Sequence, residues 1–252
     1  EQLCRGGAVF LHRSDAQYCN NTTFSNCKFE DNIAGLNGGA VDWQSGAYNG
    51  RLINSTFNNN IAWRSGGAVY WYGINGTVIG CTFIENVAVG NVTKDARGIV
   101  NYTTTGGNGG AIIWTGSVGI IKNCTFENNN ASRLGGAVYL QQNYNVTFND
   151  SYFKSNVAGY HGGAVMFNKG AENAKITDCT FEDNVAAING GAVSWEEGAE
   201  NGFMNNLRFI NNTAMRNGGA IFWNGYNGTI KNSKFYNNRA TGENWEYNMI
   251  VN

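Results

Sequence analysis

Apolar and polar residues alternate in short segments along this chain, and the segments recur at a nearly constant spacing. Two motifs mark each recurrence: F-x-x-N-x-A and, usually nine residues after its Phe, G-G-A-V/I. Successive Phe residues are separated by 28, 26, 43, 27, 28, 28 and 26 residues; they are Phe29, Phe57, Phe83, Phe126, Phe153, Phe181, Phe209 and Phe235. A period of this length, repeated along the whole chain, indicates one stacked supersecondary unit and therefore a solenoid.

Each repeat predicts three short strands separated by corners. The residue five before each Phe is apolar, and apolar residues alternate with polar ones around the Phe, which is the period of a strand. Asn, Asp or Gly stands three before each Phe and marks a corner, because these residues tolerate the left-handed backbone region. Gly-Gly in every unit weighs against the main rivals, leucine-rich and helical repeats. The sequence thus predicts an all-β single-stranded parallel β-helix of about eight turns and on the order of 40 Å in length.

The Asn of the F-x-x-N motif occupies the same position in every repeat. In-register stacking would place these residues about 4.8 Å apart. Their amides would then form a ladder of hydrogen bonds, each contributing about 0.5–1.5 kcal/mol; the residues are Asn32, Asn60, Asn86, Asn129, Asn156, Asn184, Asn212 and Asn238.

The strand that follows Gly-Gly-Ala has two uniform positions flanking a variable one. Val or Ile comes first, and a large side chain, Trp in five repeats, comes two residues later; both are expected to face inward. Five stacked Trp residues would need a roomy interior or a place at a corner. The position between them accepts residues as different as Asp, Ser and Phe, so we expect it to face solvent; it holds Phe10, Asp42, Tyr70, Ile113, Tyr139, Met166, Ser194 and Phe222.

An insertion near residues 89–106 separates the F-x-x-N-x-A motif at Phe83 from the G-G-A motif at Gly109. Solenoid insertions extrude as loops, often on a binding face, although a surface excursion without a role is an equal alternative. Lys94, Arg97 and Tyr102 are its candidate contact residues. We assign residues 1–240 to the repeats and residues 241–252 to a tail or cap, since the last repeat lacks its Gly-Gly.

Composition limits the partners and the location. A net charge of -1 provides no basic stripe for nucleic acid, and no apolar run is long enough to span a bilayer. The chain has no leader and begins inside a repeat, so we expect it to be a segment of a longer exported protein. Among its N-x-S/T sequons, those expected in loops are the better glycan acceptors; they are Asn75, Asn91, Asn101 and Asn227.

Four of the six cysteines share the column two before the Phe, where other repeats have Ser or Leu; they are Cys27, Cys81, Cys124 and Cys179. We interpret them as buried free thiols. A bridge between Cys81 and Cys124 on adjacent turns stays open, and Cys4 with Cys19 is the better disulfide candidate.

No catalytic, metal or cofactor motif is present. Sugar hydrolysis would need two carboxylates facing each other, and only Asp42 stands in the outward column. Glu196 has no evident partner, and His12 and His161 fall on distant turns. Zinc spacings and the G-G-x-G-x-D calcium repeat are absent. We therefore expect no enzymatic activity.

The paired GGA[IVL] and FxxN motifs, at a fixed offset through nearly the whole chain, resemble the repeats of chlamydial polymorphic outer-membrane proteins. They equally resemble Asn-rich adhesin-like surface proteins of methanogenic archaea. The resemblance implies a right-handed parallel β-helix, exported to the cell surface and used for adhesion.

The sequence hypothesis is accordingly an extracellular adhesin segment, a monomeric rod that binds proteins or glycans on the surface of another cell through weak, multivalent contacts. The expected contact face comprises Asp42, Tyr70, Ile113, Tyr139, Met166, Ser194 and Phe222, together with Lys94, Arg97 and Tyr102 of the insertion. Two alternatives remain: a purely structural spacer and, less favoured, a polysaccharide-active enzyme.

Overall fold

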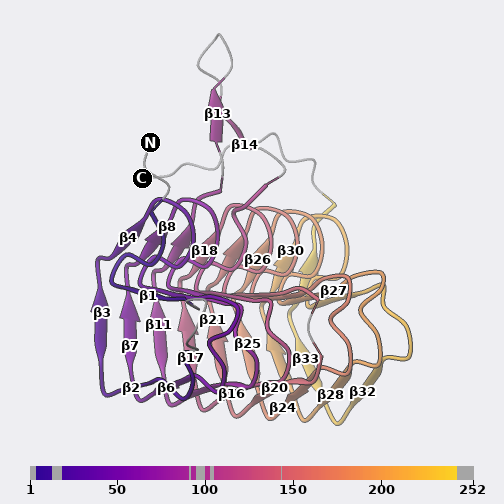
Figure 1. Cartoon of the computed structure of the whole chain (residues 1–252). Coiled ribbons are helices and arrows are strands. Elements are labelled where there is room, and N and C mark those ends of the chain that lie inside the picture. The colour runs from indigo at the N-terminus through magenta and orange to yellow at the C-terminus, as the bar shows by residue number, and fades with distance from the viewer. Residues whose placement is uncertain are drawn as a thin grey trace.

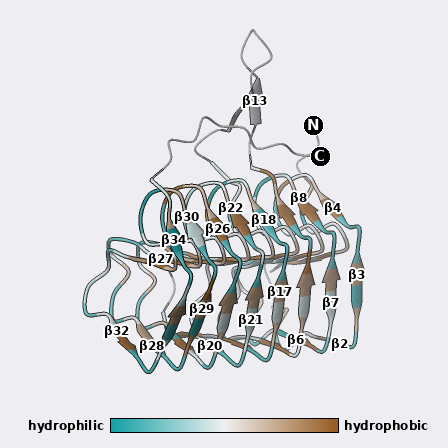
Figure 2. Ribbon diagram, turned by 180° about the vertical axis from the view of Figure 1, so that it is seen from behind, coloured by the Kyte–Doolittle hydropathy of each residue, from teal (hydrophilic) through white to brown (hydrophobic). Residues whose placement is uncertain are grey.

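The chain forms a right-handed parallel β-helix of about eight turns (Figure 1). The computed structural model describes residues 4–12, 19–90, 92–94, 100–102, 105–142 and 144–242. No helix long and apolar enough to cross a membrane occurs in these ranges. Apolar strands alternate with hydrophilic corners through the middle of the rod, whereas strands at its ends, such as β3, are more hydrophilic (Figure 2).

Four parallel sheets run along the rod, and each described turn contributes one strand to each sheet. Sheet 1 contains β1 (Val9–Leu11), β5 (Val41–Trp43), β9 (Val69–Trp71), β15 (Ile112–Trp114), β19 (Val138–Leu140), β23 (Val165–Phe167), β27 (Val193–Trp195) and β31 (Ile221–Trp223). Sheet 2 contains β2 (Thr23–Ser25), β6 (Arg51–Ile53), β10 (Gly76–Ile79), β16 (Gly119–Lys122), β20 (Val146–Asn149), β24 (Lys175–Thr177), β28 (Phe203–Asn205) and β32 (Thr229–Lys231).

Sheet 3 carries the repeated Phe and contains β3 (Lys28–Glu30), β7 (Thr56–Asn58), β11 (Thr82–Ile84), β17 (Thr125–Glu127), β21 (Tyr152–Lys154), β25 (Thr180–Glu182), β29 (Arg208–Ile210) and β33 (Lys234–Tyr236). Sheet 4 follows the repeated Asn and contains β4 (Ile33–Ala34), β8 (Ile61–Ala62), β12 (Val87–Ala88), β18 (Asn130–Ala131), β22 (Val157–Ala158), β26 (Val185–Ala186), β30 (Thr213–Ala214) and β34 (Arg239–Ala240).

The prediction of three strands per turn was therefore wrong by one. Each strand of sheet 4 has only two residues, of which the Ala is buried in most turns. Two residues are too few to show period-two alternation, so the pattern that revealed the other strands did not reveal this one.

Left-handed residues form the corners, as expected. The residue three before each Phe has φ between 46° and 64°, and a second such corner lies two after the Phe. Asn and Asp dominate both positions because they adopt the left-handed region with less strain than other non-glycine residues.

The repeated Phe and Asn residues stack as continuous ladders inside the rod. Neighbouring Phe rings are 4.7–5.0 Å apart and nearly parallel. The Asn156 amide donates to Phe126 O and Asn184 Oδ1, both at 3.0 Å. Its Oδ1 accepts from the backbone and side-chain nitrogens of Asn129, also at 3.0 Å. This confirms the predicted ladder, and the fully buried amide keeps all its polar groups paired.

The Trp residues fit inside the rod because each faces a glycine at the start of sheet 2. A Cβ on Gly76 or Gly119 would lie 2.5 or 2.3 Å from the ring of Trp71 or Trp114, respectively. In the next turn Leu140 replaces Trp in the register of sheet 1, and Val146 replaces glycine in that of sheet 2. The two columns are thus complementary in volume, as a close-packed interior requires.

The cysteines of the repeat column are free, and so are Cys4 and Cys19. The Cys124 thiol donates to Lys122 O at 3.1 Å, while Ser151 in the same column donates to Asn149 O at 2.9 Å. This shared bond explains why Cys and Ser interchange there. Burial raises the pKa of the Cys124 thiol to about 12, so it is unreactive at neutral pH.

The insertion forms an antiparallel hairpin of β13 (Val92–Lys94) and β14 (Val100–Tyr102), which projects from the corner between sheets 4 and 1 (Figure 1). Gly90 and Gly107 meet at its base, where a Cβ on Gly90 would lie 3.0 Å from Gly107 Cα. The Arg133 amide donates to Gly107 O at 2.8 Å, so the stack of turns continues beneath the hairpin.

Candidate functional site

The variable column of sheet 1 points away from the core, but most of it is covered. Its residues pair side by side from Phe10 to Phe222. Phe10 is exposed and Tyr70 and Phe222 are half-buried, whereas the other five residues are at most 5% exposed; these are Asp42, Ile113, Tyr139, Met166 and Ser194. The expectation that this column forms an open contact face was wrong for these five.

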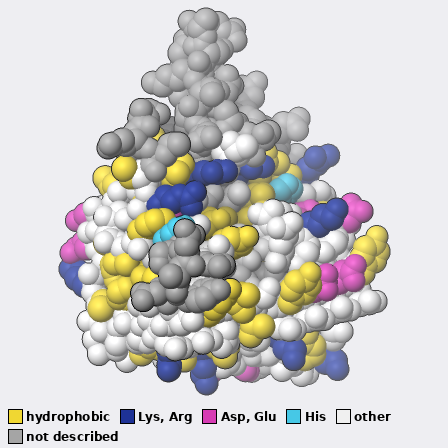
Figure 3. All heavy atoms as spheres, viewed as in Figure 1, with side chains coloured by type: hydrophobic (Ala, Val, Ile, Leu, Met, Phe, Trp, Pro, Cys, Tyr) yellow, Lys and Arg dark blue, Asp and Glu magenta, His cyan; other side chains and the backbone are white. Residues whose placement is uncertain are grey.

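A second apolar layer outside sheet 1 covers three of them, Ile113, Tyr139 and Met166. Leu134 and Tyr160, from the corner between sheets 4 and 1, pack with Ile113, Tyr139 and Met166. This corner is too irregular in sequence to show a repeating apolar position, so the layer was not predicted. Figure 3 shows apolar, histidine and basic (Lys or Arg) side chains close together on one face of the rod.

Polar residues two positions further along pair with the covered column. Asn168 donates to the Tyr139 hydroxyl at 2.7 Å, and Gln44 donates to Asp42. Burial raises the pKa of Tyr139 to about 12 and that of Asp42 to about 6, although the hydrogen bond to Gln44 partly offsets the effect on Asp42. Asp42 Oδ2 is buried and has no hydrogen-bond partner among the described residues.

Glu196 has two neighbours that were not expected from sequence. Ser194 Oγ donates to Glu196 Oε1 at 2.8 Å, and His161 Nδ1 lies 3.8 Å from the same oxygen. Burial lowers the pKa of His161, while Glu196 acts in the opposite direction. Because the serine hydroxyl donates to the carboxylate rather than to the imidazole, this cluster lacks the serine–histidine hydrogen bond of a nucleophilic relay.

The proposed contacts of the hairpin are not placed by the structure. Arg97 lies outside the described residues, and so does Asn91, one of the four expected glycan acceptors. For Lys94, Tyr102 and Asn101 only the backbone of β13 and β14 is described. Of the other two loop sequons, Asn75 and Asn227 both donate their amides to the preceding turn, to Asn49 and Asn201 respectively.

An exposed apolar group occupies the corner between sheets 1 and 2 on three consecutive turns. We call it the apolar corner; it comprises Tyr72, Ile74, Val118, Ile120 and Tyr144, each 41–46% exposed. The backbone holds these turns in register: Val118 N donates to Tyr144 O at 2.8 Å, and Asn75 N donates to Ser117 O at 3.0 Å. Contiguous exposed apolar side chains of this kind mark interaction surfaces.

Val118 adopts a conformation that valine rarely occupies. Its φ is 56°, in the left-handed region. The seven equivalent corners all hold Asn; they are Asn21, Asn49, Asn75, Asn145, Asn173, Asn201 and Asn227. A β-branched residue there costs about 1–3 kcal/mol, and such strain concentrates at functional positions. The sequence shows Val118 where the other repeats have Asn, but only the structure shows that this position is a left-handed corner.

No group of three or more His, Cys, Asp or Glu side chains in the described ranges could hold a metal ion.

Comparison with known proteins identifies the family. The family described as "Right handed beta helix region" matches residues 4–207. The Chlamydia polymorphic membrane protein repeat matches residues 206–222, which contain the F-x-x-N-x-A motif at Phe209 and the G-G-A motif at Gly218. The archaeal adhesin resemblance has no corresponding match. Searches of curated proteins and of solved structures found no match to this chain. The two family matches support a surface-exposed, outer-membrane-type β-helical protein. With four-fifths of its length matched and the fold observed, the chain belongs to the right-handed beta helix family.

Proposed function

We propose that this chain is the adhesive segment of an exported cell-surface protein, and that it binds proteins or glycans on another cell through the apolar corner. The observation that carries the proposal is the group of exposed apolar side chains around Val118, where the chain retains a strained residue in place of Asn. A spacer would gain stability from Asn at this corner and would gain nothing from exposed Tyr and Ile.

The rigid rod suits this role. Ladders of Phe, Trp and Asn fix the spacing of the turns, so the corner is held in one arrangement before binding. Preorganisation lowers the entropic cost of association. Tyr72 and Tyr144 supply flat rings with a polar end, which suit both sugar rings and protein surfaces. One patch of this size binds weakly, and many copies on a cell would raise the avidity.

The test is attachment of beads carrying the purified chain to candidate partner cells. The double variant Tyr72→Ser with Tyr144→Ser should reduce attachment at least about fivefold, because it removes both exposed rings from the corner. Thermal unfolding should remain close to that of the unchanged chain, since both side chains are largely exposed.

Tyr226→Ser is the matched control. Tyr226 is exposed at the same corner but lies several turns away, beyond the apolar corner. Its substitution should leave attachment unchanged. Equal attachment by the double variant and the unchanged chain would refute the corner as the contact. Absence of attachment by the unchanged chain would refute the adhesive role and favour the spacer.

A further inference from the structure

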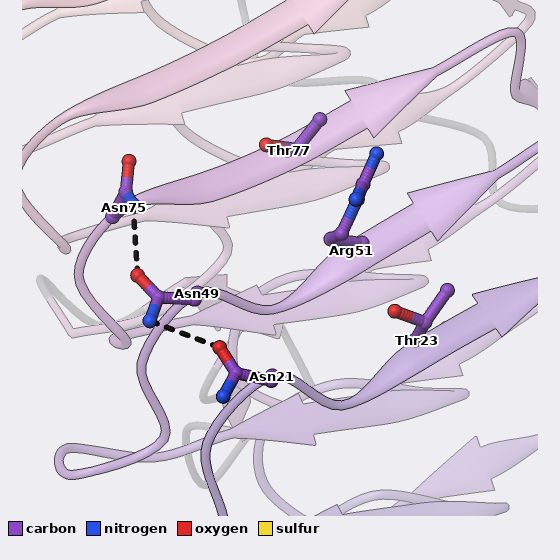
Figure 4. Close-up of a pocket in the computed structure, with 6 residues that line it drawn as sticks. All are labelled: Asn21, Thr23, Asn49, Arg51, Asn75 and Thr77. Carbon is purple, nitrogen blue, oxygen red and sulfur yellow. Dashed lines mark hydrogen bonds between the residues drawn. The ribbon is translucent and has the colours of Figure 1, made fainter.

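A polar hollow of about 310 Å³ lies beside the apolar corner, on the first three turns of sheet 2. Thr23, Arg51 and Thr77 stand in register on β2, β6 and β10. Two residues before each of them is a left-handed Asn, and these three amides complete the lining. Figure 4 shows Arg51 rising between the two threonines, with the amides along one side.

The amides form a short ladder with a free end. Asn49 Nδ2 donates to Asn21 Oδ1 at 3.1 Å, and Asn75 Nδ2 donates to Asn49 Oδ1 at 2.8 Å (Figure 4). Val118 occupies the next position and has no side-chain amide to continue the ladder. Asn75 Oδ1 therefore accepts no hydrogen bond from the described part of the chain, and it remains available at the edge of the hollow.

Arg51 brings an uncompensated positive charge. It has no ion-pair partner among the described residues, and no Asp or Glu lines the hollow. The two flanking threonine hydroxyls also have no hydrogen-bond partner in the described chain. A guanidinium presents parallel N–H groups that match a carboxylate or sulfate in a bidentate manner.

The rest of the rod offers an internal comparison. Lys175 occupies the position of Arg51 in a later turn of the same sheet. Its neighbours are Thr147 on one side and Phe203 on the other. The adjoining corners carry Glu172 and Glu200. Acidic and apolar neighbours make that position unsuitable for an anion, so the combination of cation, hydroxyls and amides is particular to the first three turns.

We propose that this hollow binds an acidic sugar, with the carboxylate or sulfate on Arg51 and the ring hydroxyls on the Asn amides and Thr hydroxyls. Amides and hydroxyls both donate and accept, as a ring with several hydroxyl groups requires. The volume lies at the lower end of the range of ligand pockets, about 300–1,000 Å³, and suits a short saccharide segment.

This site extends the proposed function by naming a ligand class, and it can be tested separately from it. Thr77 pairs with Ile120 in the register of sheet 2, so the hollow and the apolar corner are contiguous. A glycan bound at Arg51 would continue onto Ile74 and the apolar corner. The two sites nevertheless depend on different residues, and each has its own variant.

The experiment measures binding of the whole chain to three fluorescent derivatives of one dextran oligosaccharide: neutral, carboxymethylated and sulfated. We expect at least one anionic derivative to bind and the neutral one to bind at least about tenfold more weakly, because a charged hydrogen bond is lost. Whichever anionic derivative binds more tightly identifies the carboxylate or the sulfate as the recognised group. Arg51→Gln should weaken anionic binding at least about tenfold, and Lys175→Gln should leave it unchanged.

Several results would overturn the assignment. These are equal binding of neutral and anionic derivatives, unchanged binding by Arg51→Gln, an equal loss with Lys175→Gln, or no binding of any derivative. Arg51 is exposed, so its variant is expected to fold normally, and a circular dichroism melt checks this. The double variant Tyr72→Ser with Tyr144→Ser separates the two proposals, because neither residue lines the hollow: cell attachment should fall, whereas binding of a short anionic oligosaccharide should persist.

Discussion

Replacing Val118 by Asn should make the rod more stable and less adhesive at the same time. Val118 has φ 56°, and a residue with a Cβ in this region costs about 1–2 kcal/mol, more for a branched one. Asn occupies this conformation at the seven equivalent corners. Its amide would also lie in line with Asn75 Oδ1, and a new hydrogen bond contributes about 0.5–1.5 kcal/mol. Val118 is 41% exposed, so little buried apolar area is lost.

We therefore expect Val118→Asn to raise the free energy of unfolding by about 1–2 kcal/mol. For a chain of this size the melting temperature should rise by about 2–4 °C per kcal/mol. Urea denaturation and thermal melting followed by circular dichroism at 218 nm measure both quantities.

The matched control introduces the same strain elsewhere. Asn173 has φ 54° at an equivalent corner, so Asn173→Val should lower stability by a similar amount. Bead attachment should fall for Val118→Asn and stay constant for Asn173→Val. If Val118→Asn is no more stable than the unchanged chain, the left-handed strain argument fails. If attachment is unaffected, Val118 does not contribute to the contact.

Three further experiments test buried positions. Asn156→Ala should destabilise by on the order of 4 kcal/mol in urea denaturation, because it leaves its buried ladder partners unpaired; a cost below 1 kcal/mol would contradict the ladder's role. Gly119→Val should lower the free energy of unfolding by about 1–3 kcal/mol by overpacking against Trp114. In a double-mutant cycle, adding Trp114→Leu should recover part of that stability. Strictly additive effects would refute the volume complementarity of the Trp and Gly columns. Asp42→Asn should raise stability at pH 7 by up to about 2–3 kcal/mol and at pH 4 by no more than about 0.5 kcal/mol.

The sign of the Asp42 effect follows from its pKa. Burial raises the pKa of Asp42 to about 6 in the folded chain, above about 4 for an unfolded Asp. Between these values the folded state binds more protons than the unfolded state, so stability falls as the pH rises. Denaturation at several pH values measures this slope. A slope of the same size in Asp42→Asn would show that Asp42 is not its source.

Much of the fold followed from local patterns. Phe181 with Asn184, and Gly190 with Val193, recur at fixed offsets in every repeat. Each of these residues packs or bonds mainly with the equivalent residue one turn away. For this reason the ladders, the left-handed corners and the inward faces could be predicted. The two-residue strands of sheet 4 were missed because they have no alternation to detect.

The candidate site could be predicted less well. Ser194 stands in a freely varying position, which correctly placed it outside the main core, yet it is fully buried. On that side of the sheet, Ile113, Tyr139 and Met166 are covered by Leu134 and Tyr160, which come from a different corner. Free variation in sequence showed only that the repeat does not constrain a residue, and not that solvent reaches it.

The sequence by itself determined the solenoid, its period and its stacked interior, because those depend on contacts between equivalent positions one repeat apart. Only the tertiary structure decided which outward residues stay exposed, since that depends on contacts between columns that have no fixed relation in sequence. It covered the column that contains Tyr139 and left the corner at Val118 open. It also brought Arg51 between two threonines and beside three amides, a grouping that the winding of the chain creates across three turns.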